Sequence, residues 1–450
     1  MIYKQPHLPK WKKYQASVKK SARRSQYLKK IAAFFVIAGL AAALVVMLVY
    51  LGIRLPDYFR QPHAKPPAAA GQARFRPAPS PLADLKISVN TRAEDSARLA
   101  DPMILSAGGR RYFIHTAIFP KLQTYIHNTL KRSRTRQSAV VVLDPHSGRL
   151  LSMVDYDANG DAGNLCLQAD FPAASLFKIV SAAAALESAG LKPDTKLYFR
   201  GRRHTLYKSQ LKTKKDRWTT QTRFRKAFAR SNNAVFGKIG IYDLGQGNLS
   251  RYAEKFFFNR PIAFNLPLAI SRVAVPADDF GLAEISSGFN KDTLISPLHA
   301  ALLAAVAVNR GNMPTPRLVD SIGNESNKVI YQAPGPVMMP AVSRTTARDL
   351  KLLMQDAVRY GTSRGTFRKL RRKKRFKNFD LGAKTGTIND RTDRFKYDWV
   401  TAFAVPPSGS GAICVSVLGV HAKLLGTRST EMARAIVDYY FSTVGTRKAK

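Results

Sequence analysis

Residues 172–189 read PAASLFKIVSAAAALESA, and they predict a helix that is apolar on nearly every face. Pro172 stands near its first turn and Gly190 just past its end, which are favoured positions for these two residue types. A helix that has no polar face must be surrounded by protein. We therefore expect a central buried helix, around which the rest of the domain packs.

Apolar runs on both sides of this helix predict a single sheet. Two strand-like runs precede the helix, and three more follow it late in the chain. The expected elements are a helix over 117–131, a hairpin over 138–157, a mainly helical middle that includes 232–245 and 296–312, strands over 380–387, 398–406 and 411–420, and a last helix over about 429–444. We expect an α/β (α+β) domain over residues 116–450, with one antiparallel sheet assembled from both of its ends.

Ser175 and Lys178 stand three positions apart on the predicted helix, so their side chains share one face. A serine hydroxyl becomes a nucleophile when a neighbouring base takes its proton, and a lysine can do so when burial and nearby cations lower its pKa. The same spacing recurs at Ser17–Lys20 and Ser209–Lys212, in polar, basic stretches that give a lysine no reason to lose its proton. The alternative for Ser175 is a helix-start serine beside a solvent-facing lysine.

A second motif, Ser231-Asn232-Asn233, follows a helix-like stretch and precedes another helix. The hydroxyl of Ser231 can relay a proton, and the amide of Asn233 can hold a lysine or a substrate carbonyl. The alternative is an ordinary helix cap, because Ser and Asn are favoured at that position.

A third motif, Lys384-Thr385-Gly386-Thr387, stands at the end of a strand-like run. Its lysine and hydroxyls can grip a carboxylate, and Gly386 lets a ligand backbone approach the strand closely. The alternative is a strand-end turn.

The motifs occur in the order S-x-x-K, S-x-N, K-T-G, and in this the chain resembles the transpeptidase domain of membrane-anchored, monofunctional penicillin-binding proteins. The resemblance covers about residues 116–450 and extends to the flanking segments HTAIFPKLQ, AVVVLDPHSG, GTSRGTF and WVTAFAVP. It implies an antiparallel five-stranded sheet flanked by helices, with a helical subdomain. It also implies a bacterial peptidoglycan D,D-transpeptidase that cross-links stem peptides through an acyl-serine and binds β-lactams as inhibitors.

The resemblance assigns a role to each residue of the first two motifs. It makes Ser175 the acylated nucleophile and Lys178 its general base. Ser231 would pass the proton to the leaving D-alanine nitrogen, and Asn233 would orient the stem peptide.

The resemblance implies that the third motif binds the terminal carboxylate of the stem peptide. Lys384, Thr385 and Thr387 would contact the carboxylate, and Gly386 lies between the two threonines. The backbone N–H groups of Ser175 and Thr387 would form the oxyanion hole. Serine acyl transfer of this kind implies no cofactor and no metal, and the eight histidines show no ligand-like spacing.

The chain departs from the common family pattern at Ala174, where glycine is frequent, and at Asn232, where serine is frequent. Neither change removes a catalytic atom. One alternative is a D,D-carboxypeptidase or β-lactamase-type serine hydrolase, although no E-x-x-L-N element follows Ser231. Another is a non-catalytic, membrane-anchored penicillin sensor. The acidic motif of glycosyltransferase-type members is absent, so a separate glycan-strand polymerase is an expected partner.

Residues 31–53 form an uncharged run of 23 residues. At about 1.5 Å per residue, this run spans the roughly 30 Å hydrocarbon core of a bilayer. Residues 1–30 carry ten Lys/Arg and no acid, which predicts a basic cytoplasmic tail. We expect a single-pass protein of the bacterial inner membrane whose catalytic domain lies in the periplasm. Residues 54–115 form a Pro/Ala-rich spacer and juxtamembrane segment, of which 83–115 show no clear periodicity.

The formal net charge of +44, from 73 Lys+Arg against 29 Asp+Glu, calls for an anionic partner. The predicted placement outside the cytoplasm argues against nucleic acid. Residues 200–230 carry a net charge of +11 and residues 368–377 a net charge of +8, each shortly before a motif. We expect these patches to attract anionic wall polymer or lipid headgroups, and the alternative is two solvated loops.

Two cysteines, Cys166 and Cys414, exclude a disulfide framework and a cysteine-rich zinc module. They could pair outside the cytoplasm. Because one precedes the central helix and the other lies in a late strand, we expect two unpaired thiols.

Overall fold

The computed structural model describes residues 99–160, 163–422 and 425–443. The predicted cytoplasmic tail, the predicted membrane helix over 31–53 and most of the spacer lie outside these residues. Within the described ranges, no helix is both long enough and apolar enough to cross a bilayer.

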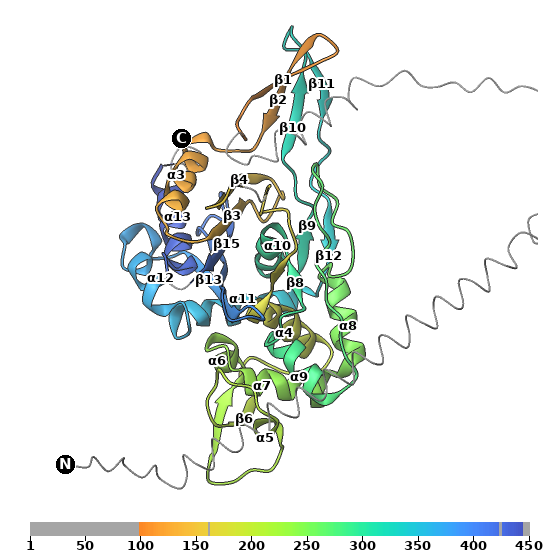
Figure 1. Ribbon diagram of the computed structural model, residues 1–450, viewed down its shortest axis with the longest axis vertical. Coiled ribbons are helices and arrows are strands. Elements are labelled where there is room, and N and C mark those ends of the chain that lie inside the picture. The colour runs from red at the N-terminus through yellow and green to blue at the C-terminus, as the bar shows by residue number, and fades with distance from the viewer. Residues whose placement is uncertain (1–98, 161–162, 423–424, 444–450) are drawn as a thin grey trace, which may run out of the picture. The chain divides into compact units, whose positions relative to one another are not determined.

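A five-stranded antiparallel sheet forms the centre of the fold, with the strand order β13-β14-β15-β3-β4 (Figure 1). Its strands are β3 Gln137–Leu143, β4 Leu150–Asp157, β13 Asp380–Asn389, β14 Lys396–Val405 and β15 Ile413–His421. The pairing of β15 with β3 joins strands from the two ends of the domain. The predicted antiparallel sheet built from both ends is therefore confirmed.

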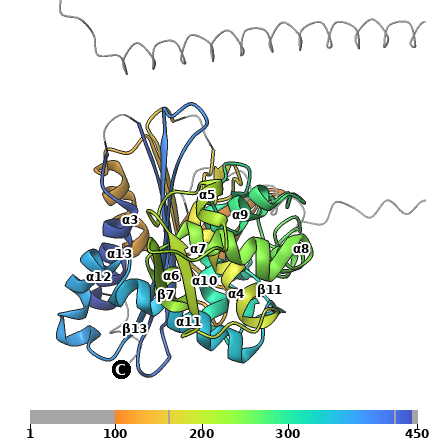
Figure 2. The same ribbon diagram turned by 90° about the horizontal axis from the view of Figure 1, so that it is seen from below.

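Successive residues of the central strands point into two different apolar layers. On β14, Trp399 belongs to one hydrophobic core and Val400 to the other, as the two-residue repeat of a strand requires. The helices α3 Pro120–Lys131 and α13 Ser429–Thr443 cover one face of the sheet, and α10 Pro297–Val308 covers the other (Figure 2). The sheet is thus buried on both faces.

The stretch 172–189 is buried as expected, but it is not one helix. It contains, in order, the end of β5 Phe171–Pro172, the 3₁₀ turn η2 Ala174–Phe177 and α4 Lys178–Glu187. The predicted α-helix from Pro172 onward is therefore wrong for the residues that precede Lys178. Pro172 pairs with Leu294 in an extended strand, and Ala174 has a φ of +49°, which a right-handed helix does not contain.

Short elements beside α4 and α10 form the helical part of the molecule, so the mainly helical middle is confirmed (Figure 2). They are β6 Lys196–Arg200, α5 Lys208–Leu211, β7 Thr219–Arg223, α6 Phe224–Ala229, α7 Asn233–Lys238, the π-helical η3 Ile239–Leu244, α8 Gly245–Lys255, α9 Asp279–Ser287 and β8 Leu294–Ile295. After them come α11 Arg344–Arg359, α12 Arg364–Arg371 and the 3₁₀ turn η4 Lys374–Phe376.

A second sheet includes residues that the sequence left unassigned. Its strands, in the order β1-β2-β10-β11, are β1 Met103–Ala107, β2 Arg110–Thr116, β10 Val319–Gly323 and β11 Val329–Gln332. A two-stranded ribbon of β9 Asn312–Pro314 and β12 Met338–Pro340 accompanies it. We expected the compact domain to begin at Thr116, but β1 and most of β2 precede that residue. The sequence pattern misses them because Ile104 and Phe113 are apolar residues on the more exposed face, so the alternation of buried residues is hidden. The strand β2 also pairs with β10, which lies far along the chain.

Both cysteines are buried, and neither forms a disulfide. Cys166 Sγ lies near the carbonyl oxygens of Val140 and Val154, while Cys414 lies within β15 opposite Leu143. The expectation of two unpaired thiols is confirmed, and the disulfide alternative is wrong.

We predict that one hydrogen bond beside η2 contributes measurably to stability. Trp399 Nε1 is buried and donates to the carbonyl oxygen of Pro172 at 2.9 Å. Trp399→Phe leaves that carbonyl unpaired, so the free energy of unfolding should fall by about 1–3 kcal/mol in urea titrations followed by circular dichroism. The matched control is Trp218→Phe, because that indole is 65% exposed. Equal losses in the two variants would contradict the prediction.

Candidate active site

Side chains from the three sequence motifs meet in one place. Lys178 Nζ lies 2.9 Å from Ser175 Oγ and 2.7 Å from Asn233 Oδ1. Lys384 Nζ lies 3.0 Å from Ser231 Oγ, and its charge acts on the neighbouring Lys178. The structure thus brings together five of the predicted site residues, from three separate parts of the chain.

The turn that carries Ser175 lies directly against β13. A Cβ atom at Gly386 would lie 3.1 Å from Ala174 Cβ and 3.3 Å from the Ser175 backbone nitrogen. A larger residue at Gly386 would therefore press on the serine turn. Ala174 itself has a left-handed φ, a conformation that costs about 1–3 kcal/mol in a non-glycine residue and that occurs mainly at functional sites.

In the second motif, Asn232 caps a helix and Ser231 contacts Lys384. Asn232 is the N-cap of α7, where its side-chain oxygen accepts a 3.1 Å hydrogen bond from the Val235 N–H. The helix-cap alternative therefore applies to Asn232, at which the chain departs from the family pattern. Ser231 precedes the cap with a φ of +52°, and its hydroxyl points to Lys384 instead of to the helix.

The third motif lies in the middle of β13 and not at the end of a strand, which corrects the sequence prediction. The strand continues because Ile388 and Asn389 still pair with β14. Lys384 is fully buried, on the face of the sheet that also carries Thr401. Since β13 is an edge strand, a ligand can lie along the third motif without displacing a neighbouring strand of the same sheet.

The two threonines of this motif hydrogen-bond within the described chain to residues outside the other motifs. Thr385 Oγ1 donates to Thr362 Oγ1 at 2.7 Å, and Thr387 Oγ1 lies 3.5 Å from Asp398 Oδ1. Thr387 is exposed and Thr385 is partly exposed. Both hydroxyls can therefore be reached by a ligand.

Burial and hydrogen bonding together favour the neutral amine at Lys178. The side chain is fully buried, and burial followed by the charge of Lys384 holds its pKa well below the ordinary value of 10.5. The amine contacts two oxygens that can only accept, Asn233 Oδ1 and the Ser287 carbonyl. A neutral amine has two N–H groups for these acceptors, so its lone pair is left to face the Ser175 hydroxyl.

Lys384 is a second buried lysine with a lowered pKa. Burial lowers its pKa from 10.5 to about 7. It donates to Ser231 Oγ at 3.0 Å and to the Thr385 carbonyl at 2.8 Å. Near neutral pH this amine can both give and recover a proton.

Sequence reasoning missed three carbonyl groups that hold the site together. The Ser287 carbonyl accepts from Lys178. The Arg203 carbonyl accepts from the Asn233 backbone N–H at 2.7 Å, and the His204 carbonyl accepts from the Asn233 side-chain amide at 3.0 Å. A main-chain carbonyl has no side-chain signature, so only the fold could reveal these contacts.

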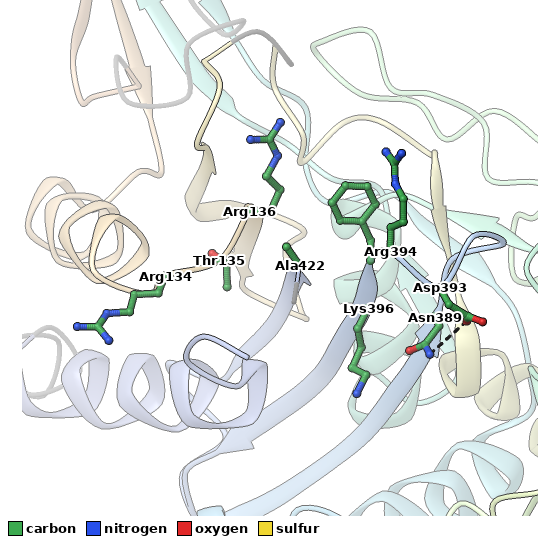
Figure 3. Close-up of a pocket in the computed structure, with 9 residues that line it drawn as sticks. Arg134, Thr135, Arg136, Asn389, Asp393, Arg394, Lys396 and Ala422 are labelled. Carbon is green, nitrogen blue, oxygen red and sulfur yellow. Dashed lines mark hydrogen bonds between the residues drawn. The ribbon is translucent and has the colours of Figure 1, made fainter. Parts of the chain in front are cut away.

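A separate pocket at the end of the sheet contains none of the predicted site residues (Figure 3). Figure 3 shows that the side chains of Arg134, Arg136 and Lys396 point in three different directions. A binding site for one small ligand normally needs polar groups that converge. Across the described part of the chain, no three His, Cys, Asp or Glu side chains are grouped closely enough to hold a metal ion.

Comparison with known proteins identifies one family. Residues 138–438 match the family description "Penicillin binding protein transpeptidase domain". The peptidoglycan D,D-transpeptidase PbpA of Mycolicibacterium smegmatis is 26% identical over 349 residues, covering 68% of this chain and 66% of that protein. The peptidoglycan D,D-transpeptidase MrdA of Haemophilus influenzae is 24% identical over 388 residues, covering 73% of this chain and 56% of that protein. This chain thus spans slightly less than two thirds of the length of PbpA.

Solved structures show the same fold. The crystal structure of PBPA from Mycobacterium tuberculosis is 25% identical with a TM-score of 0.59, covering 72% of this chain and 81% of that one. The penicillin G acyl-enzyme complex of penicillin-binding protein A from the same organism is also 25% identical, with a TM-score of 0.56. The match covers 73% of this chain and 80% of that one.

We predict that Asn232 stabilises the start of α7. Asn232→Ala should lower the free energy of unfolding by about 1 kcal/mol, because the Val235 N–H loses its side-chain acceptor. Asn232→Ser should cost less, since serine also caps helices well. Urea unfolding of the three proteins measures both effects, and an alanine variant as stable as the parent would rule out the cap.

We also predict that Lys384 makes stability depend on pH. The folded chain releases this proton near pH 7, whereas the unfolded chain keeps it to about pH 10.5. The unfolded state therefore binds more protons within this window, so the free energy of unfolding should rise with pH there. Lys384→Met should flatten the rise in urea titrations between pH 7 and pH 10, while Lys212→Met, at an exposed lysine, should not. Identical slopes in both variants would contradict the assigned pKa.

Proposed function

Because the chain belongs to the family of penicillin binding protein transpeptidase domains, we propose that it is a peptidoglycan D,D-transpeptidase that cross-links stem peptides through an acyl-serine intermediate. The observation that carries the proposal is the geometry at Lys178. Its amine lies 2.9 Å from Ser175 Oγ, while Asn233 and Ser287 occupy its two N–H groups. This arrangement supports a general base aimed at a serine nucleophile.

In the acylation step, Ser175 Oγ bonds to the carbonyl carbon of the penultimate D-alanine, and its proton passes to the lone pair of Lys178. The backbone N–H groups of Ser175 and Thr387 take the negative charge that develops on the carbonyl oxygen. The contact between Gly386 and the serine turn supports this pairing, because it holds the Ser175 nitrogen against β13. Asn233 orients the stem peptide.

In the following step the C–N bond breaks, and the leaving D-alanine nitrogen takes a proton through Ser231. The 3.0 Å contact with Lys384 supports this relay, because an amine with a pKa of about 7 can resupply the proton. Lys384, Thr385 and Thr387 bind the terminal carboxylate. A bound carboxylate would in turn favour the charged form of Lys384.

The acceptor of the acyl group then determines which of two reactions takes place. In the transpeptidase, the amine of a neighbouring stem peptide attacks the acyl-serine and regenerates Ser175. In a D,D-carboxypeptidase or β-lactamase-type hydrolase, water attacks instead and requires its own deacylating base. The penicillin G acyl-enzyme reported for a similar structure supports β-lactams as inhibitors that acylate Ser175.

The proposed cellular arrangement follows from the sequence. Residues 1–30 would form a cytoplasmic tail and 31–53 a single membrane span, followed by a spacer. The catalytic domain, which includes β1 from Met103 onward, would lie in the periplasm. The strands to be cross-linked would come from a separate glycan-strand polymerase. The basic patches over 200–230 and 368–377 would draw in anionic wall polymer or lipid headgroups.

The first test of this function is acylation by a fluorescent penicillin. We expect the purified chain to be labelled and Ser175→Ala to abolish labelling, because the attacking oxygen is gone. Ser209→Ala is the matched control, since Ser209–Lys212 repeats the spacing of the first motif outside the site. Equal labelling of the Ser175→Ala protein would overturn the assignment of the nucleophile.

Product analysis separates the candidate reactions. The chain is incubated with polymer made from lipid-linked disaccharide-pentapeptide, and the products are read by mass spectrometry. We expect cross-linked dimers. Trimmed tetrapeptides would instead identify a carboxypeptidase, rapid loss of the penicillin label would identify a hydrolase, and labelling without turnover of the polymer would identify a penicillin sensor.

A further inference from the structure

The segment from β6 to β7, residues 196–223, forms a basic hairpin with α5 in its loop (Figure 1). It holds ten Lys/Arg and a single acid, Asp216. Within the described chain, only Arg200 and Arg223 of these cations form an ion pair, with Asp216 and Asp194. Most of the positive charge of the hairpin is therefore available to a partner.

The hairpin contains a hollow of about 750 Å³. It is lined by cationic, hydroxyl and aromatic groups, among them those of Arg200, Arg202, Tyr207, Ser209, Trp218 and Thr220. The aromatic side chains at its rim are unusually open to solvent, with Trp218 65% exposed and Tyr207 62% exposed. Two exposed aromatic rings at the rim of one hollow provide flat apolar faces that a ligand can cover.

The shape of the hollow is fixed by a buried side chain. Gln210 is only 5% exposed, and its amide nitrogen donates to the carbonyls of Arg200 and Arg202 at 2.8 and 3.0 Å. Its amide oxygen accepts from Thr205 Oγ1 and from the Tyr207 backbone N–H, both at 3.0 Å. These four hydrogen bonds hold the walls together, so the hollow is preformed.

A structured turn presents the Trp218 ring. The Asp216 carboxylate accepts from the Trp218 N–H at 3.0 Å and from Thr219 Oγ1 at 3.2 Å, and it pairs with Arg200 at 2.8 Å. The guanidinium of Arg217 lies 4.9 Å from the ring centre. An aromatic face and cations are thereby combined at one point of the hollow.

The hollow is connected to the catalytic residues through the backbone. Arg202 lines the hollow, and the next two residues, Arg203 and His204, bind Asn233 through their carbonyls at 2.7 and 3.0 Å. Asn233 in turn contacts Lys178 at 2.7 Å. A ligand held in the hollow would therefore be positioned beside the active site.

We propose that this hollow binds an anionic glycan strand, with a sugar ring against Trp218 and carboxylate groups against the surrounding cations. Resting on the proposed function, we identify this strand as uncross-linked peptidoglycan, whose stem peptides carry free carboxylates. The hydroxyl groups that line the hollow favour a sugar over a bilayer, because a concave polar pocket offers little to a flat lipid surface.

The test measures binding of fluorescent, uncross-linked strands to the full chain in detergent by fluorescence anisotropy. Trp218→Ala should weaken binding by about fivefold or more, and Trp218→Phe should restore much of it, because phenylalanine keeps an aromatic face. Unchanged affinity of the Trp218→Ala protein would overturn the proposal. Failure of the proposed function would appear separately, as a parent protein that fluorescent penicillin does not label.

A charge-matched control distinguishes a local site from general electrostatic attraction. The triple variant Lys212→Ala/Lys214→Ala/Arg217→Ala removes three exposed cations from the hairpin. The control is the triple variant Lys121→Ala/Lys131→Ala/Arg132→Ala, which removes three exposed cations at the two ends of α3, outside both basic patches. We expect weaker strand binding only in the hairpin variant, and equal losses in both would overturn the proposal.

Vesicles of anionic phosphatidylglycerol test the membrane alternative. We expect Trp218→Ala to leave vesicle binding unchanged while it weakens binding of the strands. Weaker vesicle binding together with normal strand binding would show that the hairpin contacts lipid, and would overturn the proposal.

Discussion

Burial of the Lys178 amine is the physical constraint around which the site is built. Burying an ammonium group without an anionic partner costs several kcal/mol, so the fold favours the neutral form. Asn233 and Ser287 supply acceptors for the two N–H groups of that form, and the remaining lone pair faces Ser175. The second buried lysine, Lys384, adds positive charge nearby and lowers the pKa of Lys178 further. The charge state of Lys178 therefore follows from where its acceptors and neighbours lie.

The groups around Lys178 are each positioned by a different part of the fold. The apolar sheet provides β13 as a rigid edge, and Gly386 lets the serine turn lie directly against it. The turn at Ala174 and the residue Ser231 both adopt left-handed φ values, each of which costs about 1–3 kcal/mol. The two hydrophobic cores on the faces of the sheet stabilise the fold enough to hold these strained residues in place. Two of the eight non-glycine residues with a positive φ in the described chain thus lie at the candidate site.

The sequence predicted the parts of the fold that have strong local patterns. The five strands and the last helix are long apolar or amphipathic runs, and the structure contains them close to the expected positions. The prediction from sequence was wrong where contacts with distant residues determine the local conformation. The stretch 172–189 reads as one helix, yet pairing of Pro172 with Leu294 and the left-handed Ala174 delay the α-helix until Lys178. The strands β1 and β2 bury alternate residues, but apolar residues on their more exposed faces, such as Ile104 and Phe113, hide this alternation in the sequence.

The same division applies to the chemistry. Residue types, motif order and charge distribution can be read along the chain, so Ser175, Lys178 and Lys384 could be selected as candidates without a structure. Protonation states cannot be read in this way, because burial and hydrogen-bond acceptors come from segments that meet only after folding. The carbonyls of Ser287 and Arg203 carry no sequence signal at all. The sequence therefore specified which groups are candidates for catalysis, and the tertiary structure alone decided how far apart they lie and which of them have a lowered pKa.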